Sequence, residues 1–227
     1  MAEIAPVLLW LMTKKEEDDD EDEWNVSMAA ATCLQLLAAV TGGLIVPHVL
    51  PFVEANIKNA DWKFREAAVM AFGSIIDGPE SKDVAPLVSM ALPTLISLMQ
   101  DPVVHIKDTA AWTLGRICEM LVETLKPQEL QSIVQAVISG LNDSPRVASN
   151  CAWCIINLSE QTSGMEQQQT GPLDTYFDGM LYALTQAAER FLEFTQARPR
   201  FKLSRSCLRS NFHIGYQQLP VLIAYGF

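Results

Sequence analysis

One short sequence pattern occurs four times along the chain and restricts its fold more than any other feature. Each copy consists of a turn, then a β-branched or aromatic residue, then a helix rich in small side chains. Aligned on Val26, Phe64, Ile106 and Val147, the copies lie 38, 42 and 41 residues apart. This spacing is the period of solenoids built from helix pairs. The sequence therefore predicts a stack of such pairs, in which each copy begins the second helix of a pair.

The first helix of each pair is expected in the apolar segments that separate the copies. These segments are residues 4–12, 46–59, 85–100 and 129–141, and a fifth begins near Tyr176. The chain has few Gly residues and few runs of alternating polarity, so the fold class is all-α. We expect an α-solenoid of HEAT-type helix pairs over residues 1–190, with about four repeats and a partial fifth.

The third copy places a tryptophan on the polar side of its helix. At 100° per residue, Trp112 lies roughly 140–200° from the apolar residues of that helix and shares a stripe with Arg116 and Glu119. The aligned position in the fourth copy is Trp153. Seven residues after this position, on the same stripe, three repeats carry an acid: Asp77, Glu119 and Glu160.

Repeated tryptophans and acids on one stripe predict a binding groove, because second helices line one surface of a solenoid, commonly the concave one. A tryptophan face attracts Arg or Lys by roughly 0.5–2 kcal/mol, and a neighbouring carboxylate adds a charge-assisted hydrogen bond. The expected ligand is therefore a basic protein segment. The alternative is that Trp112 and Trp153 cap the packing between adjacent repeats, since periodic aromatic residues are usually core.

An uninterrupted acidic run lies between the first and second helices of the first repeat, directly before Trp24. Its eight residues are Glu16, Glu17, Asp18, Asp19, Asp20, Glu21, Asp22 and Glu23. Like charges repel, so the run is expected to be an extended surface loop. It serves either as a solvated spacer or, because it borders the groove, in partner binding.

The charge distribution excludes some partners. Residues 1–193 hold all 27 acids against 11 Lys and Arg, a net charge of −16, which makes nucleic acid an improbable partner. We expect neither a membrane span nor a signal peptide, and five scattered cysteines fit free thiols in the cytosol or nucleus. Residues 194–227 hold no acid and five Lys or Arg.

No pattern indicates catalysis, a metal or a cofactor. Cys151 and Cys154 form a CxxC, but no second pair accompanies them and Cys151 points to the apolar face, so a metal or redox protein is a minor alternative. His48, His105 and His213 lie far apart in the sequence. We therefore expect a binding protein and not an enzyme.

Long phrases of the chain resemble the importin beta family of HEAT-repeat nuclear transport receptors. They are IVPHVLPFVEANIKNADWKFREAAVMAFGSI, DTAAWTLGRIC and PRVASNCAW, and the resemblance covers about residues 4–190. It implies a receptor that binds the basic segment of importin alpha, releases it when Ran with GTP binds, and contacts Phe-Gly nucleoporins. It also implies residence in cytoplasm, nucleus and nuclear envelope pores.

The resemblance assigns roles to particular residues. Trp24, Trp112 and Trp153 match family tryptophans that contact the basic segment, Asn150 matches a polar neighbour of the last, and residues 16–23 match an acidic loop that contacts Ran. A static HEAT scaffold that assembles another complex is the alternative. Residues 191–227 lack the expected second helix, which indicates a poorly packed basic tail, read in a shifted frame or through an unspliced intron, or folded back on the acidic groove.

Overall fold

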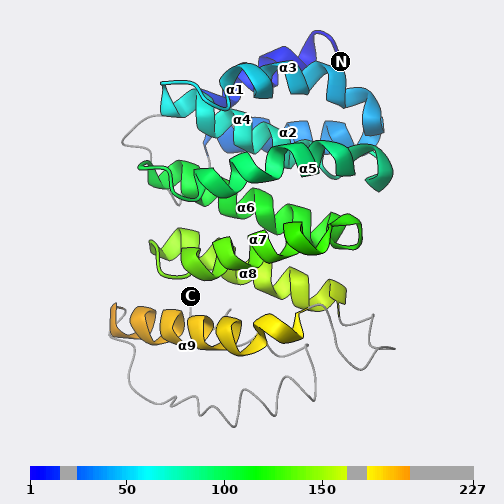
Figure 1. The fold of residues 1–227 in the computed structure, drawn as a ribbon. Helices are drawn as coiled ribbons and strands as arrows, with labels where there is room; N and C mark the ends of the chain where they lie inside the picture. Colours follow the sequence, from blue (N-terminus) through cyan, green and yellow to red (C-terminus); the bar gives the residue numbers. More distant parts are fainter. Residues whose placement is uncertain (16–24, 163–172, 195–227) are drawn as a thin grey trace.

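The structure, a computed structural model, describes residues 1–15, 25–162 and 173–194, and these form a stack of paired helices (Figure 1). The first helices are α1 (Ile4–Met12), α3 (Val46–Asn56), α5 (Ser81–Leu98) and α7 (Pro127–Gly140). The second helices are α2 (Val26–Thr41), α4 (Trp62–Ile75), α6 (Val104–Leu121) and α8 (Pro145–Thr162). Short 3-10 helices are η1 (Gly42–Ile45), η2 (Val122–Thr124) and η4 (Asp174–Tyr176), and α9 (Phe177–Phe194) lies where a fifth first helix is expected. The predicted all-α solenoid is confirmed, and its helix bounds differ from the expected ones by at most four residues.

Local capping groups fix where several helices begin. The side chain of Asn25 accepts a hydrogen bond from the backbone N–H of Met28 at 2.9 Å at the start of α2. Asp61 accepts one from Lys63 N–H, also at 2.9 Å, before α4. These side chains satisfy backbone donors that have no partner within the first turn of a helix. Turn residues in the repeated pattern thus act as helix start signals.

The second helices form the more closely packed of two rows. Among the described elements, α6 packs most extensively against α8, and α4 packs next most extensively against α6. Figure 1 shows the pairs stacked in chain order from α1 at the top to α9 at the bottom. The second helices carry buried small residues, such as Ala71 on α4, Ala110 and Ala111 on α6, and Ala148 on α8. Small side chains let neighbouring helices approach, which explains the small-residue part of the repeated pattern.

Ion pairs recur between successive repeats. Arg65 of α4 pairs with Asp101 at 3.2 Å, and Lys107 of α6 pairs with Asp143 at 2.5 Å. Each acid precedes the next second helix and also accepts a hydrogen bond from a nearby backbone N–H. One side chain therefore caps a turn and holds the preceding repeat, which sets the register of the stack.

By length and apolar composition alone, the segment Val26–Asn56 could cross a membrane, although we expected no membrane span from the sequence. In the fold it is not one straight helix. α2 ends at Gly42, whose φ of 60° is readily adopted only by residues without a Cβ, and η1 then leads into α3. Both α2 and α3 pack against α4, and Leu34, Ala38 and Val49 are fully buried in the common core. Only part of this apolar surface is buried, because Leu36, Val40 and Leu44 of the same segment are exposed.

The basic tail falls almost wholly outside the described residues. Residues 195–227 are not described, and of residues 191–194 only the helical backbone of α9 is. The poorly packed tail therefore stays a prediction.

Candidate partner-binding surface

The two predicted groove tryptophans lie at equivalent positions of α6 and α8, and each packs on a glycine of the preceding second helix. A Cβ built on Gly73 of α4 would lie 2.5 Å from Cζ3 of Trp112. A Cβ built on Gly115 of α6 would lie 2.4 Å from Cε3 and Cζ3 of Trp153. Both tryptophans remain half-buried, so part of each indole is exposed. Each indole thus covers a neighbouring repeat and still offers surface to a ligand.

The acids of the stripe are partly neutralised by a buried arginine. Nη1 of Arg116 donates a hydrogen bond to Oε2 of Glu119 at 2.8 Å, and Nη2 lies 3.3 Å from Oδ2 of Asp77. Arg116 is only 8% exposed, and its Nε finds no acceptor among the described residues. Glu160 is exposed near the end of α8. Asp77 and Glu119 therefore already share one cation that belongs to the chain itself.

The helical wheel is wrong about Arg116, which it places on a polar, exposed stripe. Asn157, on the corresponding stripe of α8, is also buried, and its Nδ2 donates a hydrogen bond to the carbonyl of Gly115 at 3.1 Å. The reason is that a second helix has neighbours on both sides in the stack as well as its partner in the pair. The side opposite the apolar face is therefore partly covered, and side chains there must pair with the next repeat.

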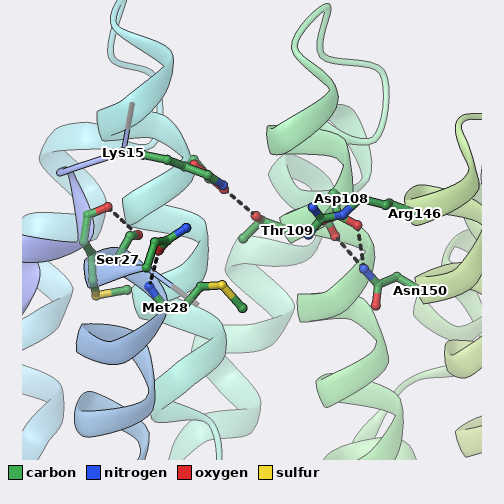
Figure 2. A network of polar contacts seen from close by, with 10 residues as sticks. Lys15, Ser27, Met28, Asp108, Thr109, Arg146 and Asn150 are labelled. Atoms are coloured by element: carbon green, nitrogen blue, oxygen red, sulfur yellow. Dashed lines mark hydrogen bonds and ion pairs between the residues drawn. The ribbon is translucent and has the colours of Figure 1, made fainter. Parts of the chain in front are cut away.

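Asn150 belongs to a polar cluster that joins α6 to α8 (Figure 2). Its Nδ2 donates a hydrogen bond to Oδ1 of Asp108 at 2.6 Å, and Arg146 approaches the other oxygen of Asp108 at 3.1 Å. Asn150 is half-buried one turn before Trp153. Asn150 thus lies one turn from Trp153 on α8, and its hydrogen bond to Asp108 holds its side chain against α6.

A second polar cluster anchors the chain directly before the acidic run. Nζ of Lys15 pairs with Oε1 of Glu66 at 2.7 Å, and the hydroxyl of Thr109 donates to the same oxygen at 3.2 Å. Figure 2 shows Lys15 reaching from the first repeat toward Thr109 of α6. Residues 16–23 and Trp24 lie outside the described residues, so their predicted contacts are not located. Lys15 and the Asn25 cap nevertheless fix both ends of this connection.

The minor metal hypothesis gains no support from the cysteines. Cys151 and Cys154 are buried in α8, and burial raises the pKa of the Cys151 thiol well above its usual range. Within residues 1–15, 25–162 and 173–194, no group of three or more His, Cys, Asp and Glu side chains could hold a metal ion. A thiol that stays protonated is a poor metal ligand.

The sequence analysis missed two sets of residues, the glycines on which the indoles pack and the ion pairs that join successive repeats. Gly73 and Gly115 are 42 residues apart, which is one repeat, and each makes room for an indole of the next repeat. Arg65 and Lys107 are also 42 residues apart, as are their partners Asp101 and Asp143. These residues recur at the period of the solenoid, and this recurrence in the sequence could have identified them.

Two family models match different parts of the chain. One is described as HEAT-like repeat and matches residues 62–117, and the other is described as importin subunit beta-1-like, TPR repeats, and matches residues 132–200. Importin subunit beta-1 of Schizosaccharomyces pombe is 47% identical over 225 residues, which cover 99% of this chain. The chain belongs to the importin beta family. The match to the S. pombe importin continues beyond residue 190, so the resemblance reaches further than we expected from the sequence.

Other importins match over the repeats. Importin subunit beta-1 of Saccharomyces cerevisiae is 44% identical over 83% of this chain. The solved structure of yeast importin-beta, Kap95p, superposes with a TM-score of 0.78 at 45% identity over 84% of this chain and 22% of its own. This chain spans about a quarter of the length of the importins that it matches, 24% for the S. pombe protein and 22% for the S. cerevisiae protein.

Two solved complexes of Kap95p also resemble this chain. In one, Kap95p is bound to Ran, and it matches 97% of this chain and 30% of its own with a TM-score of 0.74 at 35% identity. In the other, Kap95 is bound to Nup1, and it matches 98% of this chain and 29% of its own with the same TM-score and identity.

Proposed function

We propose that this chain forms part of a nuclear import receptor whose second helices bind the basic segment of importin alpha along the concave face. The observation that supports this most is the pair of half-exposed indoles, Trp112 and Trp153, set beside carboxylates in a chain of the importin beta family. A receptor of this kind acts as a carrier and not as an enzyme. It moves between cytoplasm and nucleus through the pores of the nuclear envelope.

The contacts of Arg116 suggest how a basic ligand is received. Asp77 and Glu119 are each about a third exposed, with side-chain values of 32% and 36%, so an arriving Arg or Lys can reach them. That side chain then competes with Arg116 for the two carboxylates and stacks on the exposed part of Trp112. Glu160 extends the same stripe one repeat further. Trp24 lies outside the described residues, and we expect it to contact the basic segment as well. Specificity comes from several such places at the solenoid period, each contributing modestly.

The acidic run is proposed to contact Ran. The relative Kap95p forms a complex with Ran, and the ion pair of Lys15 with Glu66 fixes one end of the run against α4. Eight consecutive carboxylates attract a basic surface and speed its association. Ran loaded with GTP is expected to bind here and to release the basic segment of importin alpha.

A cavity lined mainly by first helices supports contact with Phe-Gly nucleoporins. A cavity of about 160 Å³ lies between α3 and α5, with Phe72 of α4 and Ala91 among its lining residues. Its lining is mostly apolar, and Met90 stands 73% exposed beside it. A phenylalanine side chain would fill much of such a space, and the flexible side chain of Met90 can adapt to an aromatic ring. Ala91→Phe should fill the cavity and weaken binding of a Phe-Gly peptide while leaving binding of a basic peptide unchanged.

The groove is tested by binding of a fluorescently labelled basic segment of importin alpha. Trp112→Met and Trp153→Met remove the aromatic face but keep side-chain bulk over Gly73 and Gly115. Together they should weaken binding by about 1–3 kcal/mol with little loss of helical content. Trp10→Met is the matched control, because Trp10 is 56% exposed on α1, which packs against α2, α3 and α4. If the control and the double variant weaken binding of the basic segment equally, Trp112 and Trp153 do not form its binding groove.

The alternative function is a static HEAT scaffold that assembles another complex. The two functions differ in the response to Ran, because a receptor should release the labelled segment when Ran with GTP is added. A scaffold should bind neither the basic segment nor Ran. Absence of binding to both the labelled segment and Ran would argue for the scaffold.

A further inference from the structure

Two cysteines from different repeats meet inside the stack and have no part in the proposed binding surface. Cys118 lies on α6 and Cys154 on α8, 36 residues apart, and both are completely buried. Their sulfur atoms are 3.3 Å apart, close enough for one thiol to donate a weak hydrogen bond to the other. The two thiols are therefore already paired across the boundary between the third and fourth repeats.

The helices that carry the two thiols are held at a fixed register. Nδ2 of Asn157 donates to the carbonyl of Gly115, and Trp153 packs on the same glycine. Asn150 donates to Asp108 at the other end of the same helix pair. On α8 these contacts lie before and beyond Cys154, and on α6 they lie before Cys118, so they hold the two helices in the register that brings the sulfur atoms together.

The other described cysteines are placed differently. Cys151 lies one turn from Cys154 and is equally buried, but its sulfur points toward α7, because a Cβ built on Gly140 would lie 2.5 Å from it. Cys33 is exposed on α2. The chain thus supplies two internal controls, one buried thiol without a facing thiol and one exposed thiol.

We propose that peroxide converts Cys118 and Cys154 into a disulfide that ties the third repeat to the fourth. One thiolate attacks an oxygen of hydrogen peroxide, so that an S–O bond forms, the O–O bond breaks and water leaves. The second sulfur then displaces the oxygen of this sulfenic acid, so that the S–S bond forms and a second water leaves. Both sulfurs are oxidised and both peroxide oxygens are reduced, and a thiol reductant reverses the reaction.

The environment makes this a slow reaction that responds to sustained oxidation. The hydrogen bond with Cys118 and then burial raise the pKa of the Cys154 thiol well above its usual range. Because the thiolate is the reactive form, oxidation requires a brief local opening and should accelerate at alkaline pH. The disulfide would join α6 to α8, the helices that carry Trp112 and Trp153. Oxidation would therefore fix the spacing of the two indoles, whichever ligand they bind.

The test is peptide mapping of the unmodified chain after treatment with hydrogen peroxide. Free thiols are blocked under denaturing conditions, and the protein is digested with trypsin without reductant. Cleavage after Arg116, Arg146 and Arg190 gives two peptides. Peptide 117–146 contains Cys118, and peptide 147–190 contains Cys151 and Cys154. The expected product is these two peptides joined, with the loss of two hydrogen atoms. Thermal unfolding should shift upward by about 5–10 °C and return on reduction.

Two variants assign the linkage, and a third serves as a control. Cys151→Ala should form the cross-linked peptide as readily as the unmodified chain, whereas Cys154→Ala should not form it. Cys33→Ala should leave it unchanged. The proposal is overturned if the peptides stay separate while peroxide oxidises the exposed Cys33, or if the link persists in Cys154→Ala. Because the mapping needs no bound partner, its outcome is independent of the proposed receptor function.

Discussion

Replacing Gly115 by Ala tests whether the glycines of the second helices exist to seat the indoles. The added Cβ would lie 2.4 Å from two carbon atoms of the Trp153 ring, which is closer than real side chains approach. The rigid indole cannot bend away, so the ring or α8 must move. Overpacking of this kind costs about 1–3 kcal/mol. Ala favours a helix over Gly by about 1 kcal/mol, which offsets part of that cost.

Gly179→Ala is the matched control, because Gly179 also lies in a helix, α9, and among the described residues its added Cβ would meet only Ile138, at 3.9 Å. Gly179→Ala should therefore be neutral or stabilise the protein by up to about 1 kcal/mol. Gly115→Ala should be less stable than Gly179→Ala by about 1–3 kcal/mol in urea unfolding followed by circular dichroism. Its tryptophan fluorescence should also change, since Trp153 is displaced.

A rescue variant separates steric conflict from other causes. Trp153→Leu removes the ring that the new Cβ would meet, so adding Gly115→Ala on this background should cost less than it does in the unmodified chain. The difference is a coupling energy between the two residues. If Gly115→Ala and Gly179→Ala are equally stable, or if no coupling appears, the contact between Gly115 and Trp153 does not determine the packing of α6 on α8.

Three further predictions follow from the charges. Arg116→Met should lower stability by about 1–3 kcal/mol and strengthen binding of a basic peptide severalfold, because Glu119 loses its internal partner; unchanged affinity in fluorescence anisotropy would contradict this. The pKa of Asp143 is lowered, since hydrogen bonds from Lys107 and from a backbone N–H outweigh the effect of burial, which raises it. The ionised Asp143 carboxylate therefore stabilises the fold above pH about 4, and this contribution is lost as the pH falls through the folded-state pKa. Asp143→Asn should lower the free energy of unfolding by about 1 kcal/mol at pH 7 and have no effect near pH 2. Urea titrations at the two pH values measure this difference. Exchange of residues 16–23 for Ser and Gln should slow association with Ran and flatten its dependence on salt in stopped-flow measurements, whereas an unchanged salt slope would make the run a spacer.

Much of the fold could be read from local sequence. The bounds of α1 match the expected helix, and α9 begins one residue after Tyr176. Helix period and capping residues act within a few positions of the chain, so they can be recognised without knowledge of the fold. The period of the repeats then predicts how the pairs stack. The tryptophan positions were found in this way too, because they recur with the repeats.

The environment of each side chain in the surface could not be read in this way. A helical wheel assigns one buried face, but α6 contacts α4, α5 and α8, so the buried arc is wider than the apolar stripe. Arg116 and Asn157 are buried for this reason, and an arginine that looked like part of a polar face is an internal counter-ion.

The sequence by itself determined the helices, their pairing and the row of positions that holds Trp112 and Trp153. Only the tertiary structure decided that Cys118 faces Cys154 while Cys151 faces α7, and that Gly115 receives an indole. The physical reason is the range of the interactions. Periodicity and capping operate within one or two helical turns, whereas contacts between second helices join residues about 40 positions apart and depend on the register that ion pairs and loop lengths impose.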